Sequence, residues 1–499
     1  MRKNMLLNSI CVVTFFFAFS ALAAEPGILK ELDSHMESTE DAEKKKRGQP
    51  LDKKDDLLDQ IGKHFNGDLR LRGSHFIDSV PDTILDISTG LDKSDNTGEL
   101  LFNCSTWVEK DFWSLHTAGW IELGTQDDTY RGVSSFMRDK ERFRRHMELN
   151  EIYLTLSAKN ADLTLGKKIF ENGISTIYSP ANRYRSFDLN DPMDPKTFGA
   201  WQATLDYFVR DTTFTASVLP VFQTMKVPSV WSRWMVGNFG MYMPETLGVF
   251  DQFRYYFWEG SGIVRDLVEN RFVVVEEKLP DNKLEDYGWF GRVKTSFTLL
   301  DIFLSAYHGP SIYPVIKIEN RSGMLAIVKE NPDVFNLAAG FSITWKNFEF
   351  HGEALYNKTD NQKDDTYINY VGGLTFSEQD LVRKLHLHKI DLTLEYARES
   401  IISDQDCRGY LISSRYARIG RNDVLAHARI DVTDDISLHY KADFNRLNRS
   451  SFQRAGVSYR LRSGLMLRLG AEFFDGPFDS YFGRWCDNDR IITTLQWSF

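Results

Sequence analysis

Cysteine is scarce in this chain, which has only four among its 499 residues. Cys11 lies within an apolar stretch at the N-terminus, and three more follow it: Cys104, Cys407 and Cys486. Three cysteines allow at most one disulfide, which excludes the small disulfide-stapled scaffolds typical of secreted proteins. Their spacing does not resemble a zinc site, and the sequence leaves their disulfide state open.

Long apolar runs are also lacking beyond the first residues, and 26% of the chain is charged. A multi-span helical membrane protein is therefore excluded, because each of its helices needs about 20 mainly apolar residues. The formal net charge of −10 speaks against nucleic acid as a partner, since an acidic chain repels phosphate unless it has a concentrated basic face. General disorder is excluded as well, because 42% of the residues are hydrophobic.

Familiar catalytic motifs are missing from the sequence. It has no Gly-x-Ser-x-Gly elbow, no His-Glu-x-x-His pair and no glycine-rich phosphate loop. We therefore expect no enzyme activity, no metal and no cofactor. A Ser and a His that the fold brings together would escape such a search, so a hydrolase, or an adhesin with a sealed interior, stays an open alternative.

The single long apolar run has the features of a secretory signal peptide. Arg2 and Lys3 precede an apolar stretch at 5–20, and Ala-Leu-Ala at 21–23 provides a small-residue cleavage site. We therefore predict a signal peptide at 1–23 and export of the chain. Residues 24–66 are dense in charge and poor in aromatics, which predicts a periplasmic tail or linker.

From Gly67 onward the hydrophobic pattern has a period of two, which is typical of β-strands with two different faces. At the C-terminus, for example, Phe499, Trp497 and Leu495 alternate with polar residues. Pairs of such segments flank short polar stretches and therefore predict β-hairpins. The predicted turns lie near 109–112, 157–161, 210–212, 300–301, 346–347, 378–386, 433–435 and 463–464.

Longer connections separate these hairpins. Short turns and long loops alternate along a transmembrane β-barrel, with the turns at the periplasmic rim and the loops outside the cell. An exported sheet that spans a membrane must close on itself, because hydrocarbon offers no partner for an unpaired backbone group. We predict one all-β domain at 67–499, an antiparallel up-and-down barrel of about 18 strands (16–20). A soluble β-sandwich is the alternative and would not require alternating loop lengths.

The last strand, which ends in Gln496-Trp497-Ser498-Phe499, resembles that of Gram-negative outer-membrane porins. This resemblance covers 67–499 and implies a location in the outer membrane, in contact with lipid and lipopolysaccharide. It also implies that Phe499 and Trp497 form the signal that the barrel-assembly machinery recognises. The segments 148–153 and 163–168 are similar to those of alginate-export and related porins, which implies a polysaccharide as an alternative cargo.

If the apolar positions face lipid, the alternate positions face the lumen and determine conduction. Near the closing seam these inward positions are basic, and on the preceding strands they are acidic. The basic wall would offer anionic solutes a path, because guanidinium groups bind carboxylates and phosphates in a bidentate manner. Alternatively, the charges pair with one another, and Glu472, Asp431 and Asp443 are close enough in sequence to do so. The predicted channel-lining residues are Arg70, Arg72, Arg429, Lys441, Arg460, Arg462 and Arg468, together with Glu349, Glu353, Asp391 and Glu395.

The longest connection, 223–289, has 67 residues and contains four tryptophans. Loops of this length are usually functional or disordered. It could fold inward as a constriction or plug, or it could contain two more short strands near 250–258 and 271–277, which would make 20.

The function that the sequence favours is a channel through which small hydrophilic, anionic solutes diffuse, without chemistry. The alternative is an export port for an anionic exopolysaccharide, which would need a periplasmic partner. The tail at 25–66 is where such a partner would dock.

Overall fold

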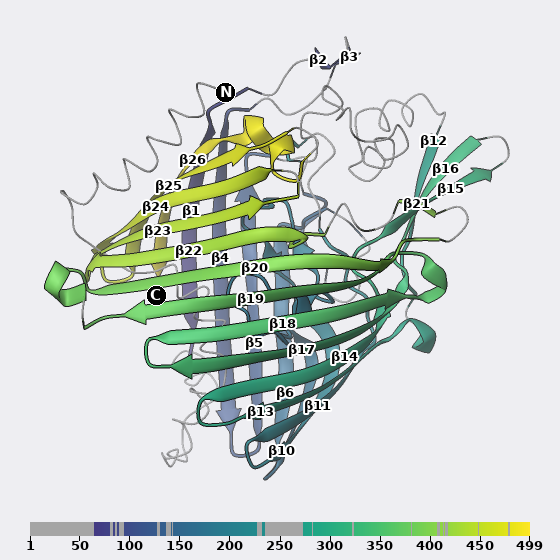
Figure 1. The fold of residues 1–499 in the computed structure, drawn as a ribbon, viewed down its shortest axis with the longest axis horizontal. Helices are drawn as coiled ribbons and strands as arrows, with labels where there is room; N and C mark the ends of the chain where they lie inside the picture. Colours follow the sequence, from purple (N-terminus) through teal and green to yellow (C-terminus); the bar gives the residue numbers. More distant parts are fainter. Residues whose placement is uncertain are drawn as a thin grey trace.

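The computed structural model shows a β-barrel that surrounds a wide interior (Figure 1). The predicted signal peptide and nearly all of the predicted tail lie outside the residues that the structure describes. Those residues are 64–79, 83–84, 87–88, 94–126, 130–135, 141, 143–226, 232–234, 273–281, 283–321, 324–380, 382–406, 410–412, 414, 418–447, 449–477 and 480–499.

Within these ranges, 18 antiparallel strands form one closed sheet. The sheet closes because β1 (Asn66–Phe76) pairs with β4 (Asn96–Lys110) on one side and with β26 (Arg490–Ser498) on the other. Each remaining strand pairs with its neighbours in chain order, which confirms the predicted barrel of 18 strands. These strands are β5 (Trp113–Gly124), β6 (Met147–Ser157), β7 (Ala161–Lys168), β10 (Ala200–Val209), β11 (Thr212–Leu219), β13 (Gly288–Ser296), β14 (Leu300–Pro310), β17 (Asp333–Trp345), β18 (Phe348–Thr359), β19 (Thr366–Glu378), β20 (Lys389–Ser403), β22 (Asn422–Thr433), β23 (Ile436–Asn445), β24 (Ser450–Arg462) and β25 (Leu465–Asp475).

Tight turns join the strands at one end of the barrel, which we call the turn end. Lys346 begins the turn between β17 and β18 with a positive φ of 56°, and Gly464 closes the turn between β24 and β25 with a φ of 75°. A side chain at Gly464 would meet the backbone oxygen of Ser498 at 2.4 Å, so glycine is needed there. The chain also ends here, since Phe499 and Gly67 exchange two backbone hydrogen bonds of 2.8 and 2.9 Å.

The longer connections lie at the opposite end, the loop end, and some of them form a second sheet. Its four strands are β12 (Val273–Lys278), β16 (Met324–Glu330), β15 (Val315–Arg321) and β21 (Tyr410–Ile412), and Figure 1 shows it projecting beyond the barrel. Strand β12 corresponds to the extra strand that the sequence suggested near 271–277. It pairs in parallel with β16 outside the barrel, so it does not add to the 18 barrel strands. Residues 250–258 lie outside the described ranges.

The two faces of the barrel differ as the period of two predicts. On β17, Leu337, Phe341 and Trp345 are 41%, 43% and 56% exposed, whereas Asn336 and Ser342 are nearly buried. The same alternation places leucine, phenylalanine and isoleucine on the outside of most other strands. Among the described residues, no helix is long and apolar enough to cross a membrane.

Candidate functional site: the lumen and its constriction

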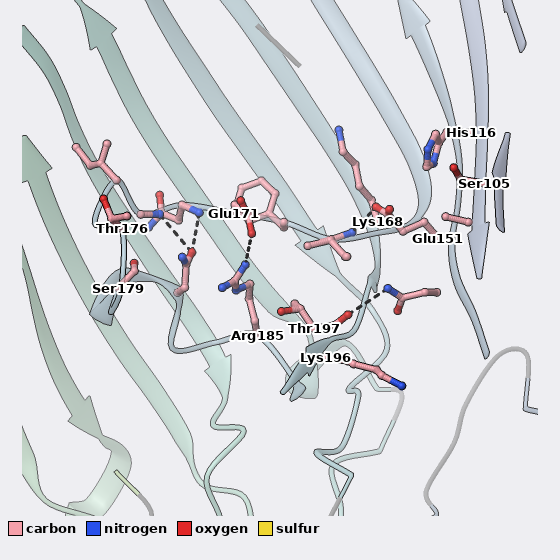
Figure 2. Close-up of a pocket in the computed structure, with 18 of the residues that line it drawn as sticks. Ser105, His116, Glu151, Lys168, Glu171, Thr176, Ser179, Arg185, Lys196 and Thr197 are labelled. Atoms are coloured by element: carbon pink, nitrogen blue, oxygen red, sulfur yellow. Dashed lines mark hydrogen bonds and ion pairs between the residues drawn. The ribbon is translucent and has the colours of Figure 1, made fainter. Parts of the chain in front are cut away.

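The barrel encloses a cavity of about 3450 Å³. Residues close to the short turns, such as Asp111, Lys159 and Asp211, line its mouth, so the cavity opens at the turn end. Its far side is formed by residues of the connection between β7 and β10, which Figure 2 shows beside the wall residues His116 and Glu151.

This connection, residues 169–199, crosses the interior of the barrel, and we call it the constriction segment. It contains the short strands β8 (Phe187–Asp188) and β9 (Lys196–Thr197) and the 3-10 helix η3 (Pro180–Asn182). Asn172 donates a hydrogen bond of 2.6 Å from Nδ2 to Ser305 Oγ on β14. Further along, Arg183 donates one of 3.1 Å to the hydroxyl of Tyr367 on β19. A single segment thus contacts β14 and β19, which have β17 and β18 between them in the barrel.

The sequence placed the candidate constriction in a different connection, at 223–289. Most of that connection lies outside the described ranges, including Trp231 and Trp258. Its residues 232–234 pack at the loop end, where Trp234 contacts Phe76, Phe474 and Trp485 edge-on.

The first two residues of the predicted basic wall bind the constriction segment. Arg72 reaches Asp191 at 2.7 Å and Asp194 at 3.0 Å, and Arg70 lies 3.4 Å from Glu99 and 3.8 Å from Asp194. Asp191 also forms an ion pair of 2.9 Å with Arg490 of β26. Burial favours the neutral acid, but Arg490 and Arg72 outweigh it and lower the pKa of Asp191 to about 2. Arg70 and Arg72 therefore pair with carboxylates of the constriction segment.

A second ion-pair cluster continues this contact. Glu472 of β25 is fully buried and accepts hydrogen bonds from Arg454 Nε at 2.5 Å and Arg490 Nε at 2.6 Å. Arg454 also donates to the backbone oxygen of Met193 in the constriction segment at 2.9 Å. Strands β24, β25 and β26 thus hold this segment through a shared set of charges.

The other predicted basic residues are placed as follows. Lys441 and Arg468 line the cavity, while Arg429 is buried and pairs with Asp431 at 2.7 Å. Arg460 is half-buried near the turn end and is not among the cavity-lining residues.

The prediction that Arg462 lines the channel is wrong, because this residue lies on the outer face of the barrel. The pairing of β24 with β25 shifts between Arg460 and Arg462, so Arg462 is opposite Leu465, which in turn is opposite the exposed Trp497. Directly paired residues share a face of a sheet. A bulge of one residue therefore moved Arg462 out of the lumen.

The predicted acidic residues all face inward but have different partners. Glu349 lines the cavity and accepts a hydrogen bond of 2.7 Å from Ser342 Oγ, and Asp391 accepts one of 2.6 Å from Ser377 Oγ. Glu353 and Glu395 are 4% and 1% exposed and contact the constriction segment. Glu353 and Glu395 thus position the constriction segment.

Sequence reasoning missed several basic residues that line the cavity. Arg292 and Lys294 alternate with Val293 on β13, so the period of two would have found them, whereas Arg454 follows the polar Gln453 on β24. Arg183, Arg185 and Lys196 belong to the constriction segment, which carries no such pattern. Over its whole lining, the cavity has 13 lysines and arginines and 11 aspartates and glutamates.

These charges are not evenly distributed. Many of the acidic ones lie close to the short turns, for example Asp111, Asp162, Asp211 and Asp301. Basic residues lie there as well, for example Lys159 and Arg210, and others line the cavity on the constriction segment, namely Arg183, Arg185 and Lys196. Within the described ranges, no group of three or more His, Cys, Asp or Glu could hold a metal ion. Cys104 and Cys486 are free thiols, and Cys407 lies outside those ranges.

The outside of the barrel is apolar and its inside is polar and charged, which reverses the arrangement in a soluble protein. In a closed sheet every strand has a neighbour on both sides, so the backbone can cross hydrocarbon without unpaired groups. The protein is an outer-membrane β-barrel.

Of the comparisons with known proteins, only the one with solved structures found similar chains. No protein-family model matches the chain, and the search of curated proteins found no relative. The barrel is similar to solved structures of Pseudomonas aeruginosa OpdK with vanillate (9% identity, 88% of this chain and 99% of that one, TM-score 0.44) and Acinetobacter baumannii OccAB4 (9%, 87% and 98%, 0.44). It is also similar to Escherichia coli Wzi, described as a carbohydrate-binding β-barrel involved in group 1 capsule assembly (11%, 86% and 83%, 0.42).

Proposed function

We propose that this barrel is a passive channel for small hydrophilic solutes, that it favours anions, and that residues 169–199 form its constriction. The observation that carries the proposal is the large cavity in which 13 basic side chains, including Lys168, Lys441 and Arg468, outnumber 11 acidic ones. The solute moves by diffusion, and the chain performs no chemistry on it.

The distribution of charge supports the preference for anions. Deep in a narrow, partly desolvated passage, each charge acts more strongly than at the wide and hydrated mouth. On the constriction segment, three basic residues line the cavity (Arg183, Arg185 and Lys196) and two acidic ones do (Glu171 and Asp194), which supports a preference for anions. Guanidinium groups such as that of Arg292 present planar pairs of donors that suit carboxylates and phosphates.

Conductance of the refolded protein in a planar bilayer tests the channel, and the reversal potential under a salt gradient tests its selectivity. We expect steady openings with an anion-selective potential. Steady cation-selective openings would retain the channel and reject the anion preference. Absence of openings would reject the channel.

Residues on β23, β24 and β25 provide variants that separate the lumen from the outer face. Replacing Lys441 and Arg468 by serine should shift the reversal potential toward cations, because both residues line the cavity. Arg462→Ser should leave it unchanged, since this arginine is on the outer face near the same turn. An equal effect of the two changes would show that the charge acts through the membrane surface and not through the lumen.

A second candidate function is export of an anionic exopolysaccharide, favoured by where the N-terminal tail meets the barrel. The ring of His64 lies 4.7 Å from that of Trp107, which lines the cavity, so the tail joins the barrel at the cavity mouth. In an outer-membrane barrel this turn end faces the periplasm. A partner docked on the tail would therefore stand at the entrance.

Deleting residues 25–60 tests this candidate. If the tail recruits a periplasmic partner for export, the deletion should abolish polysaccharide secretion by cells and leave single-channel conductance unchanged. Normal secretion without the tail would count against export through such a partner.

A further inference from the structure

Two carboxylates of the barrel wall are buried against the constriction segment. Glu353 on β18 is 4% exposed and Glu395 on β20 is 1% exposed. A carboxylate removed from water must be satisfied by several donors, because its charge is otherwise very costly to bury. The donors around these two glutamates therefore reveal what they hold.

Glu353 accepts its hydrogen bonds from both ends of a short stretch of the segment. Its Oε1 accepts from the backbone N–H of Ile174 and, at 2.5 Å, from that of Ser175. Its Oε2 accepts from the hydroxyl of Ser179 at 2.7 Å and from the N–H of Ala181 at 3.4 Å.

Glu395 holds the residues in between. Its Oε1 accepts from the backbone N–H of Thr176 at 2.9 Å and of Ile177 at 2.8 Å, and its Oε2 accepts from that of Tyr178 at 2.9 Å. Nε2 of His351 lies 3.0 Å from Oε1 of Glu395. Every residue from 174 to 179 therefore donates to one of the two glutamates.

The strands leave room for both carboxylates by placing glycine beside each. Gly340 is directly opposite Glu353, and Gly373 is directly opposite Glu395. A methyl group at Gly340 would lie 2.9 Å from Cγ of Glu353, and one at Gly373 would lie 2.6 Å from Cγ of Glu395. The wall is thus shaped around these side chains, which is a second and independent sign of a built site.

The hydrogen bonds explain why this stretch keeps one conformation. Residues 172–179 form no strand and no helix, so their N–H groups have no sheet or helix partner of their own. Successive N–H groups that point to one place form a concavity that binds an anion. Here the anion is a side chain of the wall, and charge-assisted hydrogen bonds are stronger than neutral ones.

We propose that Glu353 and Glu395 are positioning residues that hold residues 174–181 across the lumen and thereby set the width and steadiness of the channel. This inference rests on the proposed channel function. The two glutamates contact the loop and not the solute, so their role differs from that of the basic residues that line the passage.

The test is the double variant Glu353→Gln with Glu395→Gln, measured by single-channel recording. An amide places a donor against N–H groups that are themselves donors, so the loop should leave its position. We expect conductance to rise about twofold, with frequent transitions between levels, and larger neutral polymers to enter the pore. Glu378→Gln is the matched control, because Glu378 is likewise a buried glutamate of the wall, accepts a hydrogen bond from Asn347 instead of the loop, and does not line the cavity.

A second background separates positioning from general damage. When residues 172–196 are replaced by a short linker, which removes the N–H donors themselves, the two Gln substitutions should have no further effect on conductance. An additional effect in that background would overturn the proposal, as would unchanged conductance of the double variant in the native loop. If the double variant does not assemble, each single substitution is recorded in its place, with an increase expected for both.

The wild-type recording distinguishes this inference from the function on which it rests. If the wild-type protein does not conduct, the channel function fails. If it conducts steadily and the Gln variants match it, the channel stands and the role of the two glutamates is rejected.

Discussion

Replacing residues 172–196 by a short glycine-serine linker should raise single-channel conductance several-fold. The segment touches β14 through Asn172, β19 through Arg183 and β1 through Asp191, so it occupies the cross-section of the barrel. Conductance depends on the narrowest cross-section and on the groups that line it, and both change when the segment is removed.

The matched control removes a loop of similar kind outside the lumen. Residues 315–330 carry β15 and β16, which pair with β12 and β21 in the projecting sheet and do not line the cavity. Their removal should leave conductance unchanged. Equal conductance of the wild-type protein and the 172–196 variant would mean that another part of the chain limits the pore.

Glu472→Ala should destabilise the barrel strongly, by about 3–5 kcal/mol, because removing one partner of a buried ion pair leaves the other charge uncompensated. Glu472 is fully buried and accepts from both Arg454 and Arg490. Its loss leaves two guanidinium groups without their shared carboxylate. Arg490 and Arg454 also bind the constriction segment at Asp191 and Met193, so that segment should loosen too.

Urea unfolding in lipid vesicles, followed by tryptophan fluorescence, measures this loss. Glu349→Ala is the control, and we expect a loss below about 1 kcal/mol because this glutamate lies near the wide mouth and bonds a neutral hydroxyl. A loss below about 1 kcal/mol for Glu472→Ala as well would show that water reaches and screens the cluster.

The architecture of the barrel was predictable because it depends on local patterns. Two faces of different polarity require a period of two, and tight turns require residues such as Gly464 that tolerate a positive φ. Both signals are contained in stretches of about ten residues. The inward orientation of Glu353 and Glu395 followed from the same pattern.

The partners of these residues could not be predicted, because they depend on contacts between distant parts of the chain. Glu395 binds Tyr178 from 217 residues away, and nothing in the composition of 169–199 marks it as the segment that turns inward. The misplacement of Arg462 has a different cause, a bulge of one residue that exchanges the two faces of the strand. The connection 223–289 was predicted to form the constriction because of its length, but most of it lies outside the described residues.

The ion pairs of Asp191 also order the events by which the barrel is made. Asp191 binds Arg72, which is 119 residues earlier in the chain, and Arg490, which is 299 residues later. Contacts this distant form late, because the intervening chain must first be organised. The last strand must therefore be in place before Asp191 has both partners. The part of the constriction segment around Asp191 would therefore be fixed later than residues 174–179, whose partners Glu353 and Glu395 belong to earlier strands.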